Sequence, residues 1–349
     1  MPIIRFRPSL KLNNKPLPTM VKDTNSMSDI ISRGIRVVSG QREIITDENR
    51  LALANKRQGL EARVLPIDLI ANNILQAIKD QHAYSIIRLG DAEILTLAQD
   101  TVFPTSVNVP VWGDLMAKLC HDPLLGKGDN NEVVRWRDMM YASGIDYPDL
   151  NARDRLTAAV KSANLIGIPT KNRPGRSRAH LKLVEGFQTV FLEFLGLHNM
   201  NPNSMQFGDS ALHYLLYSTG WMYKILFPGD YPEICQRYSF PPNFKPEVLL
   251  VGNRADELAD LMVPRGLKIS GVIKPVNMSN IDNTLQAICE HSFDIALMAA
   301  GISAKILCSL TAQRMNRVAF DAGHLFDLLV DHFRHLDHQR TRIPYEWML

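Results

Sequence analysis

The stretch EVLLVGNRADELADLMVPRGLKISGVI, residues 247–273, contains the pattern that decides the fold. Its first six residues form a short apolar run that predicts a buried strand. A helical pattern begins at about Ala255, and a second strand is expected from Leu267 to Ile273. A strand that leads through a helix to another strand forms a right-handed crossover, so the two strands pair in parallel.

The same alternation continues on both sides of this unit. Downstream, strands are predicted at 293–299 and 317–320, with helices from about Ile281, Ser303 and His324. Upstream, we expect a helix at 66–80, strands at 84–89 and 164–169, helices after both, and a short strand followed by helices within 205–227. The near-continuous apolar strands are typical of a sheet that is covered by helices on both faces. The fold class is therefore α/β, a Rossmann-like, mostly parallel sheet with helices on both faces.

Composition and charge exclude several classes of protein. The chain has 349 residues, of which 46% are hydrophobic, and a net charge of +3. These values exclude a disordered or collagen-like chain and give no reason to expect a nucleic-acid partner. Four cysteines without a C-x-x-C pair argue against a zinc ribbon or a redox motif.

The first 60 residues differ from the rest. Basic residues outnumber acidic ones there, and polar residues and prolines interrupt any apolar period. We expect residues 1–60 to be a weakly structured basic extension and residues 61–349 to form the main domain. The extension could contact an anionic membrane surface, support a homodimer or remain a poorly ordered tail. No apolar run reaches the about 18 residues of a membrane span, so a cytoplasmic location is expected.

Ligands of open parallel sheets bind beyond the carboxyl ends of the strands. Neither a G-x-G-x-x-G nor a P-loop motif occurs at these turns, which argues against dinucleotide oxidoreductases and P-loop NTPases. The turn at 90–93 places Asp91 and Glu93 two residues apart, directly after a strand. Two close carboxylates favour a shared divalent cation. The alternative is that Asp91 caps the next helix and Glu93 stabilises its first turn.

The whole phrase YSIIRLGDAE, residues 84–93, resembles the opening motif Ser-x-x-Arg-x-Gly-Asp-Gly-Glu of the bacterial GT-D-fold glycosyltransferases. It matches at every fixed position except Ala92, where the family carries glycine. Three further stretches are similar to later strands and turns of that family: 163–169, 248–252, and the pair 293–301 and 318–327. The resemblance covers about residues 65–333 and leaves out the extension.

This resemblance implies a GT-D type fold and a transferase that uses a nucleoside-diphosphate sugar and a divalent metal, Mn²⁺ or Mg²⁺. Asp91 and Glu93 would be the metal-site residues, and the acceptor would be a glycan or a glycoprotein. A metal or fixed cations would neutralise the charge that grows on the departing diphosphate. A non-catalytic nucleotide-binding or docking module of a bacterial surface-glycan assembly system is the alternative function.

Further candidates lie at the other strand ends. Arg88 would bind the diphosphate or fix the carboxylates. His324 is the candidate base, and Asp321 would orient it or contact substrate; a core or capping role is the alternative for His324. Asp209 is a second candidate base or acceptor-site residue, or a helix cap. The remaining positions are candidate donor-binding residues: Gly90, Lys171, Arg173, Arg176, Arg178, Gly252, Asn253 and Gly301. The four basic residues among them would form a phosphate clamp or a solvated loop.

Overall fold

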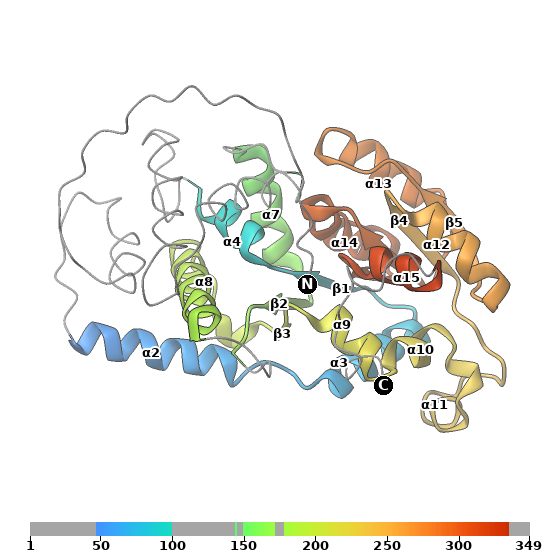
Figure 1. The fold of residues 1–349 in the computed structure, drawn as a ribbon, viewed down its shortest axis with the longest axis horizontal. Helices are drawn as coiled ribbons and strands as arrows, with labels where there is room; N and C mark the ends of the chain where they lie inside the picture. Colours follow the sequence, from blue (N-terminus) through green and yellow to red (C-terminus); the bar gives the residue numbers. More distant parts are fainter. Residues whose placement is uncertain (1–46, 100–143, 145–148, 172–177, 335–349) are drawn as a thin grey trace.

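The computed structural model describes residues 47–99, 144, 149–171 and 178–334. Its centre is a seven-stranded parallel sheet with the order β3-β2-β1-β7-β6-β4-β5 (Figure 1). The strands are β1 Tyr84–Arg88, β2 Leu165–Ile168, β3 Phe207–Asp209, β4 Val248–Gly252, β5 Ile269–Ile273, β6 Ile295–Ala299 and β7 Val318–Asp321. The predicted α/β class with a parallel sheet is confirmed.

Helices cover both faces of the sheet. One core lies between the sheet and α4 Asp91–Ala98, α7 Leu150–Ser162, α8 Arg178–Leu197, α13 Ile281–Cys289 and α14 Gly301–Met315. The other core lies against α3 Ile67–Asp80, α9 Leu212–Ser218, α10 Trp221–Leu226, α11 Pro232–Tyr238, α12 Ala255–Met262 and α15 Leu325–Phe333.

The strand sequences explain this layering. In β4, Leu249 and Val251 enter the first core, whereas Val248 and Leu250 enter the second, because successive side chains of a strand point to opposite faces. All four are completely buried. Burying one such side chain stabilises the fold by about 1.5–3 kcal/mol relative to leaving it exposed.

The connections place a crevice at the carboxyl edge of the sheet. The strands β1 and β7 are neighbours, but α4 leaves β1 on one face while α15 leaves β7 on the other. The turns after two such strands diverge, and an open α/β sheet binds its ligands at a point of this kind.

Helix α14 is buried almost all round. It packs on β1, β6 and β7 and against α7 and α13. Its buried side chains are apolar or small, with the exception of Lys305. A charge in such a helix requires partners, because an unpaired buried ammonium is costly.

The predicted extension is in part wrong. Residues 1–46 lie outside the described part, but Asp47–Glu61 forms helix α2, which packs against α8. Leu60 is buried there, and the Glu61 carboxylate accepts a hydrogen bond from Gln188. The apolar period of this helix is weak, and polar contacts to α8 help to hold it in place. Among the described residues, no helix is long and apolar enough to cross a membrane.

Candidate active site

A cleft of about 660 Å³ opens at the carboxyl edge of the sheet. It is lined by the turns that follow β1, β3, β4, β5, β6 and β7. Seven of the residues predicted from the sequence line it: Arg88, Gly90, Asp91, Glu93, Asn253, Gly301 and His324. The sheet topology therefore brings together turns that lie as far apart in the sequence as those of Arg88 and His324.

The turn after β1 is a helix start. Helix α4 begins at Asp91, and Gly90 is its N-cap residue. The Glu93 Oε2 atom accepts a hydrogen bond from the Gly90 backbone N–H at 2.9 Å, as in a capping box. Asp91 is thus the first helical residue and not the cap, whereas Glu93 has the first-turn role that was the alternative to metal binding.

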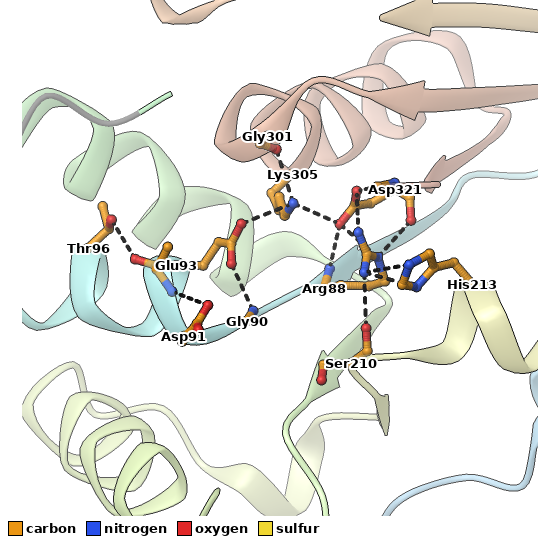
Figure 2. Close-up of polar contacts among 12 residues, drawn as sticks. Arg88, Gly90, Asp91, Glu93, Thr96, Ser210, His213, Gly301, Lys305 and Asp321 are labelled. Carbon is orange, nitrogen blue, oxygen red and sulfur yellow. Dashed lines mark hydrogen bonds and ion pairs between the residues drawn. The ribbon is translucent and has the colours of Figure 1, made fainter. Parts of the chain in front are cut away.

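Lys305 approaches this turn from α14 (Figure 2). Its Nζ atom lies 3.1 Å from Glu93 Oε1 and 3.3 Å from Asp321 Oδ2, and it donates to the Gly301 carbonyl at 3.0 Å. The side chain is only 5% exposed. Burial alone would lower the pKa of Lys305, but the Asp321 and Glu93 carboxylates outweigh it and raise this pKa. The lysine is therefore charged at neutral pH.

Arg88 extends the same network on the other side of Asp321. Its Nε and Nη2 donate to the Asp321 carbonyl and carboxylate at 2.9 and 3.2 Å, and Nη1 donates to the Ser210 carbonyl at 3.1 Å. Nη1 also lies 2.9 Å from His213 Nδ1 and 3.4 Å from His213 Nε2. The second Nη2 N–H has no acceptor among the described residues, and it is the Arg88 donor that remains for a ligand in the cleft.

Asp321 is the centre of these charges. Its side chain is completely buried, and burial would raise its pKa, but Arg88 and Lys305 outweigh burial and lower it. The next turn fits closely around it: a Cβ at Gly323 would collide with Arg88 Nη2, and this glycine has a φ of +49°. The network Glu93–Lys305–Asp321–Arg88 is thus built into the fold.

Asp91 lies outside this network (Figure 2). Its Oδ1 accepts from the Ala92 backbone N–H at 2.9 Å, and it forms no ion pair with any residue that the structure describes. Burial, and next the charge of Glu93, raise the pKa of Asp91. Asp91 is therefore a cleft-lining carboxylate without a compensating cation in the described part of the chain.

These contacts determine how a divalent cation fits. Mg²⁺ is commonly held by one or two carboxylates together with phosphate oxygens of the substrate. Asp91 meets that requirement, whereas both Glu93 oxygens already accept from Gly90 and Lys305. Within the described ranges, no group of three or more His, Cys, Asp or Glu side chains could hold a metal ion. The residues fit an ion held by Asp91 and a bound diphosphate, but not one shared by the two carboxylates.

His324 lies at the rim, where its side chain is 81% exposed. Its Nδ1 is 3.1 Å from Asp327 Oδ2. The prediction that Asp321 orients His324 is wrong, because Asp321 is buried against Arg88 and Lys305. Burial would raise the pKa of Asp327, but His324 and Arg254 lower it.

Asp209 does not line the cleft. Its Oδ2 accepts from the Thr170 hydroxyl, and its Oδ1 accepts from the Ala211 backbone N–H at 2.6 Å. Both oxygens therefore already have donors. Asp209 therefore orders the turn before α9, but it is not the cap of this helix, whose N-cap residue is Ala211.

The candidate donor-binding residues have separate positions. The Asn253 Oδ1 accepts from the Val276 backbone N–H at 3.0 Å and so joins the turns after β4 and β5. Gly252 does not line the cleft; a Cβ there would collide with the Ala299 carbonyl oxygen, so its role is close strand packing. Lys171 pairs with Glu185 at 2.6 Å, away from the cleft.

The predicted phosphate clamp is otherwise untested. Arg173 and Arg176 lie outside the described residues, and of Arg178 only the backbone is described, as the first residue of α8. Sequence reasoning also missed Lys305. The signal for Lys305 was a charge among the small and apolar residues of the first three turns of α14. Arg254 joins the rim carboxylates Glu257, Asp327 and Asp331.

Comparisons with known proteins show to which family the chain belongs. The model of the GT-D fold-like domain matches residues 65–229 and 233–329, which is more than half of the chain. A search of curated proteins and a search of solved structures each found no match. The matched residues include all seven strands and the turns that line the cleft. The chain therefore belongs to the GT-D fold-like domain family.

Proposed function

We propose that this protein is a glycosyltransferase that moves a sugar from a nucleoside-diphosphate sugar to a glycan or glycoprotein acceptor. Membership of the GT-D-like family and the position of the cleft support this proposal. The single observation that carries it is Asp91, a cleft-lining carboxylate without a cation of its own in the described part of the chain, beside an Arg88 N–H that remains for a ligand. The two groups complement a diphosphate that arrives with a divalent ion.

The chemistry of glycosyl transfer assigns roles to these residues. Negative charge grows on the departing diphosphate, and a Mn²⁺ or Mg²⁺ ion bound there would supply electrostatic stabilisation. Asp91 would hold that ion, and Arg88 would donate to a phosphate oxygen. The exposed His324 would accept the proton of the acceptor hydroxyl, with Asp327 fixing its ring.

The test combines donor binding and turnover. A panel of nucleotide sugars is screened by thermal shift with and without Mn²⁺, because a ligand that binds only the native state raises its apparent stability. Sugar transfer from the best donor is then measured for wild type, Asp91→Asn and the control Asp282→Asn, whose exposed carboxylate pairs with Arg155 outside the cleft. Asp91→Asn should lose at least about a hundredfold in turnover. Turnover at the native rate would show that the site is assigned wrongly.

A non-catalytic nucleotide-binding module is the second candidate. The observation that favours it is Glu93, whose two oxygens are engaged by Gly90 and Lys305 and so offer no second carboxylate to a metal. Calorimetry separates the two functions. Donor binding without hydrolysis or transfer across an acceptor panel supports the binding module, whereas sugar transfer to any acceptor excludes it.

A further inference from the structure

Lys305 is an unusual residue at its position in the fold. It lies in the second turn of α14, between the buried side chains of Ala304 and Ile306. Replacing a buried ion group by a well-packed apolar one is often neutral or stabilising for a protein. The helix packing therefore does not explain a lysine here, and its contacts must.

Those contacts join three segments. The Lys305 ammonium contacts the Gly301 carbonyl of its own helix, Glu93 of α4 and Asp321 of β7. An ammonium has three N–H donors, and these three acceptors account for all of them. Lys305 therefore has no donor left for a phosphate oxygen and acts through Glu93 and Asp321.

The contact with Lys305 restricts the side chain of Glu93. Its Oε2 caps the start of α4 and its Oε1 pairs with Lys305, so the side chain is fixed from both sides. A divalent cation bound to Glu93 Oε1 would either displace the buried Lys305 ammonium or be repelled by its charge at close range. Asp91, two residues earlier on the same turn, has no such partner among the described residues.

We propose that Lys305 is a positioning residue that withholds Glu93 from metal binding, so that the turn takes its divalent cation through Asp91 and the oxygens of a bound diphosphate. This inference rests on the proposed donor site. One carboxylate binds a divalent ion weakly, and the phosphate oxygens supply the missing ligands. Cation and nucleotide therefore bind cooperatively, each raising the affinity of the other by the same factor.

Equilibrium dialysis tests this directly on the full-length protein. Protein-bound Mn²⁺ is measured with the metal alone and with saturating UDP, GDP or CDP. For wild type, at least one of these nucleotides should raise Mn²⁺ affinity by about tenfold or more. Equal binding of Mn²⁺ with and without all three nucleotides would overturn the proposal.

Variants of the two carboxylates separate their roles. Asp91→Asn should abolish nucleotide-dependent Mn²⁺ binding. Glu93→Gln should keep it, weakened by no more than about tenfold, because the side chain at this position acts on the turn and not on the metal. If Glu93→Gln abolishes this binding as Asp91→Asn does, Glu93 is a ligand and the proposal fails.

Substitution of Lys305 gives a readout that a merely structural role would not produce. Lys305→Met frees the Glu93 carboxylate, and Mn²⁺ alone should then bind about tenfold more tightly than to wild type, because metal affinity rises with the number of charged ligands. Lys305→Arg keeps the charge and should show no such gain. No gain in a folded Lys305→Met protein counts against the proposal; if this variant does not fold, the Glu93→Gln result decides.

The outcomes also distinguish this inference from the proposed function. Cooperative Mn²⁺ binding that depends on Asp91 and not on Glu93, without sugar transfer, leaves the inference standing and removes the glycosyltransferase assignment. Sugar transfer together with Mn²⁺ binding that needs both carboxylates supports the glycosyltransferase assignment and overturns the inference about Lys305.

Discussion

Asp321→Asn tests whether the buried charges of the site are part of the fold. The Asp321 carboxylate is completely buried and accepts from Arg88 Nη2 at 3.2 Å and from the Gly323 backbone N–H at 3.1 Å. Lys305 Nζ lies 3.3 Å from its second oxygen. Asparagine removes the charge and one acceptor, which leaves Lys305 paired with Glu93 alone and Arg88 without a carboxylate partner among the described residues. Breaking such a buried pair costs about 3–5 kcal/mol.

The assay is urea unfolding at pH 7, followed by circular dichroism. The matched control is Asp327→Asn, whose carboxylate is 45% exposed and pairs with Arg254 and His324 at the rim. An exposed pair contributes about 0–1 kcal/mol, so the control should lose far less stability than Asp321→Asn. Equal losses in the two variants would refute the reasoning.

The stability difference between wild type and Asp321→Asn should also depend on pH in a defined direction. The native pKa of Asp321 lies below its ordinary value, because Arg88 and Lys305 outweigh the effect of burial. Its contribution to stability is therefore fully present above the unfolded pKa of about 3.9 and is lost as pH falls through the native pKa. The difference between wild type and Asp321→Asn should stay constant from about pH 5 to 8 and shrink in stronger acid.

Three further predictions concern single residues of the cleft. Because burial and Glu93 raise the pKa of Asp91, its ionised form opposes folding; Asp91→Asn should stabilise the protein at pH 7 by about 0.5–1 kcal/mol, and thermal unfolding should show this gain disappearing below about pH 4. Gly323→Ala incurs about 1–2 kcal/mol for a left-handed backbone and also displaces Arg88; urea unfolding should show a larger loss than for Gly220→Ala, which has a φ of +76° and open space around it. His324→Ala should change stability by about 0.5 kcal/mol or less but lower sugar transfer about a hundredfold; an unchanged transfer rate would remove His324 as the base.

Much of the fold could be predicted from the sequence. Apolar runs gave six of the seven strands within about two residues, because a strand buried in a covered sheet leaves a continuous apolar signal. The short β3 was predicted only as a strand somewhere within 205–227. The rule on carboxyl strand ends placed Arg88, Asp91 and His324 at one cleft. Helix α2 was missed because its apolar period is weak. Polar contacts to α8 help to hold it, and a sequence pattern does not reveal such contacts.

The pairing of charges within the site could not be predicted. Sequence spacing made Asp91 and Glu93 look equivalent, but the packing of α14 brings Lys305 to Glu93 and leaves Asp91 apart. Asp321 and His324 are close in sequence, yet β7 directs Asp321 into the core while the α15 start exposes His324. These differences depend on tertiary contacts between segments that are distant in the sequence, which local patterns do not encode.

The central claim is that the turn at residues 90–93 receives a metal-bound diphosphate through Asp91. The most direct measurement is a crystal structure of the protein with Mn²⁺ and the nucleoside diphosphate that gives the largest thermal shift. The account predicts a manganese ion on the Asp91 carboxylate and the phosphates, with Glu93 still paired with Lys305. A nucleotide bound outside this cleft, or a manganese ion on Glu93 with Asp91 turned to solvent, would contradict it.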